Sequence, residues 1–197
     1  MAKKYDLSDL SFLIIDDNNY MLSIIKTLLR GFGVHEIHEA HDAAEAFEEF
    51  SNLPIDIILL DYAMNTLDGI EFARMVRTAD DTPNPYVPIV MLSAYSEHFR
   101  VTDARDVGIT EFLRKPICAQ DLHQRIIQVI ENPRPFIRTP RYFGPDRRRM
   151  AGRRGSGRKD DGQNNEERRV NNLKLEKAVK TENMARVIKK SAASNAF

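Results

Sequence analysis

The chain has 197 residues, which allows one domain with an appendage or two small domains, and its single cysteine excludes an internal disulfide framework. Its formal net charge is zero, but residues 1–133 hold 11 basic and 22 acidic residues, whereas residues 134–197 hold 18 and 7. An acidic body therefore precedes a basic tail. This asymmetry indicates that the tail meets an anionic partner or the acidic body itself.

No secretory or membrane segment is predicted. Asp6 and Asp9 interrupt any signal-peptide core near the start, and the longest apolar runs are far shorter than a membrane span. We therefore expect a cytoplasmic protein. The lone thiol, Cys118, follows a Lys-Pro pair closely and is expected to be a small buried side chain rather than a nucleophile.

Apolar runs alternate with amphipathic segments throughout the body. In chain order, the predicted elements are a strand over 10–15, a helix from 18 or 19 to 31 or 33, a weaker strand over 34–40, a helix over 43–50, a strand that enters after Pro54 and ends at Asp61, a helix over 69–78, a strand over 89–94, a helix over 97–107, a strand over 109–113 and a helix over 121–130. Five strands alternating with five helices predict a doubly wound parallel sheet, covered by helices on both faces.

Polar side chains follow the predicted strands where each one ends. Asp16 and Asp17 follow the first strand, and Asp61 ends the third. Taken alone, Asp61 is better explained as a helix cap or a loop residue than as a functional group. However, parallel strands end at one edge of a sheet, where ligands and chemistry collect, so these carboxylates are expected to meet.

Three clustered carboxylates repel one another unless a cation neutralises them, and a hard oxygen-binding ion such as Mg²⁺ does so. Lys115 and the hydroxyl of Ser93 follow the last two strands and suit phosphoryl oxygens. The set indicates a carboxylate that attacks phosphorus, with the metal and the lysine balancing charge.

Over residues 8–132 the chain resembles the receiver domain of two-component response regulators, of the chemotaxis-regulator type. The resemblance rests on five motifs in order, which are Asp16-Asp17, Asp61 followed by Met64, Asp68-Gly69, Ser93-Ala94 and Lys115-Pro116. It implies a flavodoxin-like sheet of strand order 2-1-3-4-5. It also implies a phosphoacceptor in a phosphorelay rather than an enzyme acting on a separate substrate.

The resemblance also implies roles for individual residues. Asp61 would accept a phosphoryl group from a histidine kinase or phosphotransfer protein, and Lys115 and Ser93 would contact its oxygens. The metal site would comprise Asp16, Asp17, Asp61 and the Ala63 carbonyl. Phe112 matches the aromatic switch position, although it lacks the tyrosine hydroxyl common in the family and also fits a plain core residue. Lys115-Pro116 would be a cis peptide.

The tail begins with an unusual basic segment. Residues 134–158 contain nine arginines, no lysine and a single acid, Asp146, together with three prolines and four glycines. Such a composition cannot build a core, so residues 133–165 are expected to be a disordered ligand-binding segment. The exclusive use of arginine favours bidentate contacts to phosphate or guanine and stacking on bases.

This tail resembles the arginine-rich extension of chemotaxis-regulator-like cyclic di-GMP effectors, which direct their output to targets such as the flagellar motor. The residues expected to bind the ligand are Tyr142, Phe143, Asp146, Arg147, Arg148, Arg149, Arg153 and Arg154. Two aromatic rings could stack on a base, and the Asp146 carboxylate could accept hydrogen bonds from the N–H groups of a guanine. RNA, DNA or an anionic membrane surface is the alternative partner, and a third interpretation is an arm that is merely solvated or that docks on the acidic body.

Residues 166–193 carry a ragged apolar stripe, which is compatible with a C-terminal helix but too irregular for a coiled coil.

Overall fold

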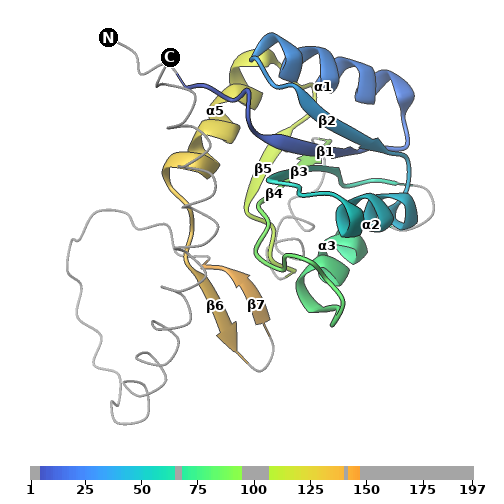
Figure 1. Ribbon diagram of the computed structural model, residues 1–197, viewed down its shortest axis with the longest axis vertical. Helices are drawn as coiled ribbons and strands as arrows, with labels where there is room; N and C mark the ends of the chain where they lie inside the picture. The colour runs from blue at the N-terminus through green and yellow to red at the C-terminus, as the bar shows by residue number, and fades with distance from the viewer. Residues whose placement is uncertain (1–4, 65–67, 95–106, 140–141, 147–197) are drawn as a thin grey trace, which may run out of the picture.

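The computed structural model describes residues 5–64, 68–94, 107–139 and 142–146. Within these ranges, five parallel strands form one sheet in the order β2-β1-β3-β4-β5 (Figure 1). The strands are β1 (Ser11–Ile15), β2 (Glu36–Ala40), β3 (Ile57–Asp61), β4 (Ile89–Ser93) and β5 (Glu111–Arg114). The predicted doubly wound, flavodoxin-like sheet is confirmed.

Within the described residues, four helices connect or follow these strands. They are α1 (Asn19–Gly31), α2 (Ala43–Asn52), α3 (Gly69–Thr78) and α5 (Ala119–Glu131). Three of them begin where a short polar side chain accepts a hydrogen bond from the first turn, at Asn18, Asp42 and Asp68. The helices expected over 97–107 and 166–193 fall almost entirely outside the described residues.

Helices α1 and α5 cover one face of the sheet, and α2 and α3 cover the other (Figure 1). Successive residues of the central strands alternate between the two faces: Phe12 and Ile14 pack toward α1 and α5, whereas Leu13 and Ile15 pack toward α2 and α3. Strands β1 and β3 are buried along their whole length. Because both faces of these strands are buried, their sequences are continuous apolar runs.

The parallel register brings the C-terminal ends of the central strands to one edge. Ile15 pairs with Leu60, and Asp61 pairs with Leu92. Ser93 in turn pairs with Arg114. The residues that directly follow or end β1, β3, β4 and β5 therefore lie at the same edge of the sheet.

An antiparallel hairpin follows α5, in a region expected to be disordered. It comprises β6 (Phe136–Thr139) and β7 (Tyr142–Pro145), and in Figure 1 it lies beside the sheet edge opposite the strand C-termini. The expectation is wrong for this stretch because its aromatic side chains pack on the body, so its own short sequence does not have to supply a core. The remainder of the tail, residues 147–197, lies outside the described residues.

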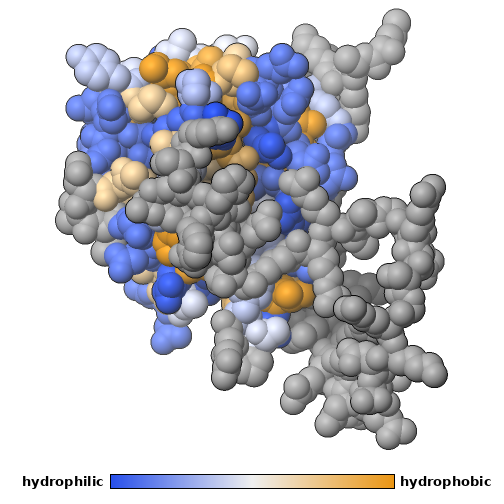
Figure 2. Space-filling model, turned by 180° about the vertical axis from the view of Figure 1, so that it is seen from behind, coloured by the Kyte–Doolittle hydropathy of each residue, from blue (hydrophilic) through white to orange (hydrophobic). Residues whose placement is uncertain are grey.

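The described surface visible from behind Figure 1 is largely hydrophilic, with smaller apolar areas (Figure 2). No described helix is both long and apolar enough to cross a bilayer.

Cys118 is exposed and accepts a hydrogen bond from the Asp121 amide at the start of α5. The prediction that it is buried is therefore wrong, because capping a helix keeps this side chain at the surface.

Candidate phosphoryl-transfer site

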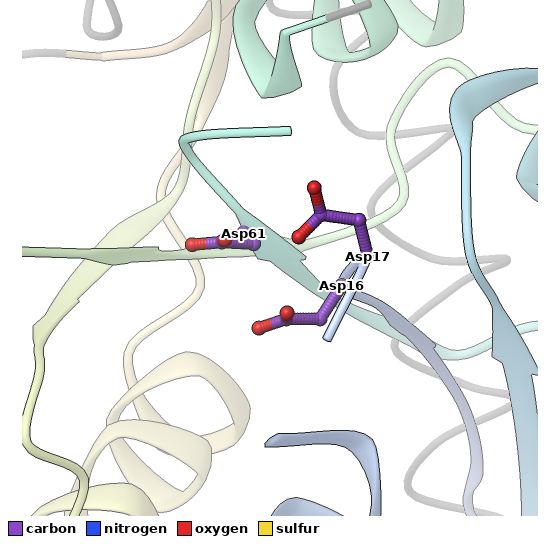
Figure 3. Close-up of side chains that lie close together, drawn as sticks. All are labelled: Asp16, Asp17 and Asp61. Atoms are coloured by element: carbon purple, nitrogen blue, oxygen red, sulfur yellow. The ribbon is translucent and has the colours of Figure 1, made fainter. Parts of the chain in front are cut away.

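Three carboxylates meet at the C-terminal edge of the sheet. Asp16 and Asp17 directly follow β1, and Asp61 is the last residue of β3 (Figure 3). One oxygen from each carboxylate lies within 4.8 Å of the others. Asp16 is fully buried and Asp61 is 6% exposed, whereas Asp17 is partly exposed to solvent. The cluster is thus buried on one side and open on the other.

Lys115 inserts its ammonium group between two of these carboxylates. Its Nζ lies 2.9 Å from Asp16 Oδ2 and 2.9 Å from Asp61 Oδ1. The lysine follows β5 directly, and its amide donates to the Ser93 carbonyl, which ties its backbone to β4. The Lys115-Pro116 peptide is cis, as the resemblance implies. A cation therefore already occupies part of the space between the acids.

The buried setting changes the acid–base properties of the pair. Burial raises the pKa of the Asp61 carboxyl above its usual value; the nearby Asp16 charge adds to this rise, while Lys115 opposes it. Burial by itself lowers the pKa of Lys115, but its hydrogen bonds to Asp61 and Asp16 and their charges together outweigh burial and raise it. The lysine consequently keeps its positive charge at neutral pH.

The other residues expected at this site lie around the cluster. Ser93 ends β4, and its hydroxyl donates to the Ala94 carbonyl at 3.1 Å. Ala63 is exposed in the segment after β3. Phe112 is half-buried on β5 and packs against the core beneath α2 and α3.

Such an arrangement has the parts that phosphoryl transfer to a carboxylate requires. Three strand ends hold a nucleophilic oxygen, a fixed cation and an oxygen-rich cluster that suits a hard metal ion.

Comparison with known proteins agrees with this geometry. Residues 12–127 match the family model described as the response regulator receiver domain.

The chain belongs to the response regulator receiver family.

The chain matches some relatives over nearly their whole length and others over only part of it. It is 30% identical over 122 residues to the chemotaxis protein CheY of Pseudomonas aeruginosa, covering 62% of this chain and 97% of that protein. It is 27% identical to the transcriptional regulatory protein ZraR of Klebsiella oxytoca, covering 65% of this chain but 29% of that protein. In structure, it matches CheY4 of Vibrio cholerae with a TM-score of 0.56 at 26% identity, covering 61% of this chain and 98% of that one.

The predicted tail residues are only partly described. Tyr142 and Phe143 are half-buried on β7, and the Tyr142 hydroxyl donates to the Pro145 carbonyl at 2.7 Å. The guanidinium of Arg138 lies over the Phe143 ring, 4.4 Å from its centroid. Asp146 ends the described part of the tail. The arginines expected to bind ligand, at 147, 148, 149, 153 and 154, lie outside the described residues.

Sequence reasoning missed the residues that join the hairpin to the receiver. Arg77 of α3 is buried beneath the hairpin, and Glu111 of β5 forms ion pairs with Arg125 and Arg134. A local signal for the hairpin was present, because aromatic and β-branched residues flank Pro140. No local signal marked Arg77, since an arginine in the last turn of a helix is ordinarily exposed and favours the helix dipole.

Proposed function

We propose that Asp61 accepts a phosphoryl group from a phosphohistidine on a sensor kinase or phosphotransfer protein. A carboxylate oxygen of Asp61 forms a bond to phosphorus while the phosphorus–nitrogen bond of the donor breaks. The electron pair of that bond returns to the imidazole, and the product is an acyl phosphate on Asp61. The observation that carries the proposal is the Lys115 ammonium held 2.9 Å from both Asp16 and Asp61 within the acidic cluster.

The residues of the cluster fit Mg²⁺. Mg²⁺ takes oxygen ligands at about 2.0–2.1 Å and keeps several waters, and one oxygen from each of the three carboxylates lies within 4.8 Å of the others, close enough for the acids to serve one ion directly or through those waters. Asp16, Asp17, Asp61 and the Ala63 carbonyl are the groups that would hold the ion directly or through water. When bound, Mg²⁺ supplies positive charge that neutralises the carboxylates and the transferred group.

Lys115 supports the same step through its positive charge. Its charge favours the ionised form of Asp61, which is the nucleophilic form, against the burial that raises the pKa of that carboxyl. On phosphorylation the ammonium can pair with a phosphoryl oxygen, and the Ser93 hydroxyl can exchange its Ala94 partner for another. Phe112, which lies on β5 three residues before Lys115 in the chain, is the proposed switch residue. The chain then acts by a change of binding partner rather than by turnover of a separate substrate.

Phosphoryl acceptance is tested with acetyl phosphate and Mg²⁺, with beryllofluoride as a stable analogue. We expect wild type to gain a phosphoryl group that is lost in Asp61→Asn, and to lose the response when Mg²⁺ is chelated. Asp42→Asn is a matched control, because it makes the same chemical change at a helix cap that asparagine also suits. Phosphorylation of Asp61→Asn at the wild-type rate would remove Asp61 as the acceptor.

For the tail, the proposed ligand is cyclic di-GMP. Arginine-only basic character, two aromatic residues and one acid suit a compact guanine dinucleotide with two phosphates. The stacking of Arg138 on Phe143 supports the proposal, since a base can stack on the same kinds of group. In this proposal a cytoplasmic protein combines phosphorylation with the second messenger to control a protein partner such as the flagellar motor.

The tail proposal is tested by calorimetric titration of the full chain with cyclic di-GMP, GTP and single-stranded RNA. We expect cyclic di-GMP to bind most tightly. Equal, weak and steeply salt-dependent binding of all three would instead indicate sequence-blind counterion release. That result would favour the alternative, in which phosphorylation controls a protein that binds RNA, DNA or an anionic membrane.

A further inference from the structure

The β6–β7 hairpin packs on the receiver through a cluster of three aromatic rings. Tyr86, in the segment before β4, lies with its ring centroid 5.2 Å from that of Phe136 and 5.3 Å from that of Phe143. Phe136 and Phe143 lie 5.7 Å apart across the hairpin. Both contacts to Tyr86 are edge-to-face, an arrangement that aromatic pairs prefer. The receiver supplies one ring of the cluster and the hairpin supplies the other two.

Two backbones meet at the same junction. Gly108 directly precedes the segment that leads into β5, Gly144 lies on β7, and both are buried. A Cβ atom added at Gly144 would lie 2.6 Å from Gly108 Cα, and one added at Gly108 would lie 3.0 Å from the Phe143 carbonyl oxygen. The hairpin therefore approaches the receiver more closely than a side chain at position 144 permits.

Arg77 of α3 holds the receiver side of this junction in shape. Its Nε donates to the Gly108 carbonyl at 3.1 Å, and its Nη1 donates to the Pro85 carbonyl at 2.8 Å. Both bonds lie within the receiver and link the segments that precede β5 and β4. We call Arg77, Tyr86 and Gly108 the seat of the hairpin. Because the hairpin takes no part in these two bonds, the seat keeps them when the hairpin leaves.

Closing the hairpin over Arg77 also has a cost. The Phe136 ring lies over the guanidinium, with 5.2 Å between Cζ and the ring centroid, and Arg77 is only 3% exposed. Its Nη2 is buried and has no hydrogen-bond partner among the described residues. Burial lowers the pKa of Arg77 to about 9, because covering the side chain disfavours its charged form. Packing of the rings and burial of the charge therefore act in opposite directions on docking.

The hairpin is connected to α5 by a short segment that contains Pro133 and Pro135. Arg134 in this segment pairs with Glu111 of β5. The Asp146 amide donates to the Pro135 carbonyl at 2.7 Å, so the two ends of the hairpin are tied to each other rather than to the receiver. A two-stranded hairpin is marginally stable by itself in water. Both strands are therefore expected to lose their pairing together when the hairpin leaves its seat.

We propose that the β6–β7 hairpin is a strap that opens as one unit while the receiver stays folded. The closed strap covers the seat, whereas the open strap exposes the Arg77 guanidinium and the Tyr86 ring, so the two states present different surfaces. The bonds of Arg77 keep the seat ready for closing. Segments with few buried contacts open at lower free energy than the core of a domain. A partner that binds only one of the two surfaces shifts the balance by mass action.

Amide hydrogen exchange in the full chain tests whether the strap opens as a unit. We expect the amides of β6 and β7 to share one protection factor, at least about tenfold above that of an unfolded chain and at least about 100-fold below that of β3. Equal protection in the hairpin and β3 would show that the hairpin opens only when the receiver unfolds. Absence of protection would show that it does not dock in solution, and different protection in β6 and β7 would show fraying. Each of these three results would overturn the proposal.

Two variants test the contacts that hold the strap closed. Gly144→Ala places a methyl group against Gly108, and Tyr86→Ala removes the receiver ring of the aromatic cluster. Each should speed exchange throughout the hairpin by at least about tenfold and leave the protection of β3 unchanged. Gly31→Ala and Tyr20→Ala are the matched controls, because a methyl group at Gly31 meets nothing within 4 Å and Tyr20 is 82% exposed. Both controls should exchange as wild type does in the hairpin.

The comparison of the hairpin with β3 decides how the variants are interpreted. Wild-type exchange in the hairpin of both variants would show that the seat does not hold the strap closed. An equal loss of protection in the hairpin and in β3 would show that the two form one cooperative unit. Either result would overturn the proposal, whereas faster exchange confined to the hairpin would support it.

Discussion

The contact between α3 and the end of β3 makes Gly69→Ala the most informative single change. Gly69 is the first residue of α3, and its amide donates to the Tyr62 carbonyl. A Cβ atom there would lie 3.2 Å from the carbonyl carbon of Asp61 and 3.2 Å from Leu60 Cγ, and it would clash with the carbonyl oxygen of Asp61. The start of α3 therefore rests directly on the backbone of the proposed phosphoacceptor.

The size of the effect follows from that geometry. To reach ordinary van der Waals separation, the helix start and the Asp61 backbone must move apart by about 1 Å. Overpacking of this kind costs about 1–3 kcal/mol of unfolding free energy. A displacement of about 1 Å at a reacting group slows a positioned reaction by about 100-fold. We expect Gly69→Ala to show both losses, because the same movement causes them.

Urea unfolding and the rate of phosphorylation by acetyl phosphate measure the two quantities. Gly31→Ala is again the control, since alanine is favoured over glycine within a helix and has room there. The control should be as stable as wild type or more so, with an unchanged rate. If Gly69→Ala matched the control in both measurements, the close contact between α3 and Asp61 would not exist in solution.

Three further predictions concern charged groups. The raised pKa of Asp61 means that its ionised form is less favourable in the folded state than in the unfolded state. Asp61→Asn should therefore stabilise the protein at pH 7, by an amount that shrinks as pH falls and the wild-type carboxyl takes up a proton. Urea unfolding at several pH values measures this, and a stability gain that does not depend on pH would contradict it. Lys115→Met leaves buried Asp16 facing Asp61 without a counter-charge, and it should lower the unfolding free energy by about 3 kcal/mol at pH 7. If the cluster binds Mg²⁺, adding the ion should recover part of that stability. Glu111→Gln removes the charge that pairs with Arg134. It should speed amide hydrogen exchange in the hairpin and leave phosphorylation of Asp61 unchanged. Unaltered exchange would show that this ion pair does not anchor the hairpin.

Much of the receiver could be predicted because its local signals agree with its tertiary structure. The predicted helix over 69–78 matches α3 at both ends, and the helix predicted from residue 43 begins there as α2. Strands buried on both faces must be apolar along their length, so β1 and β3 stand out in the sequence. Parallel strands also end at one edge of their sheet, and this rule alone is enough to predict that Asp16 and Asp61 meet.

The hairpin could not be predicted from composition because its core is shared. Residues 134–158 as a whole have too few apolar side chains to build a core alone, and that observation led to the expectation of disorder. The missing partner, Tyr86, lies some 50 residues earlier in a loop. Nothing in the sequence near Tyr86 or Arg77 indicates that a later segment covers them.

The sequence by itself determined the order of strands and helices, the edge at which the acidic residues gather, and the arginine-only character of the tail. Each of these follows from short-range pattern or from a rule of parallel sheets. Only the tertiary structure decided that Lys115 bridges Asp16 and Asp61, and that the first part of the tail is held against Arg77 and Tyr86. These contacts join residues far apart in the chain, and their distances depend on how the whole fold packs rather than on any local preference.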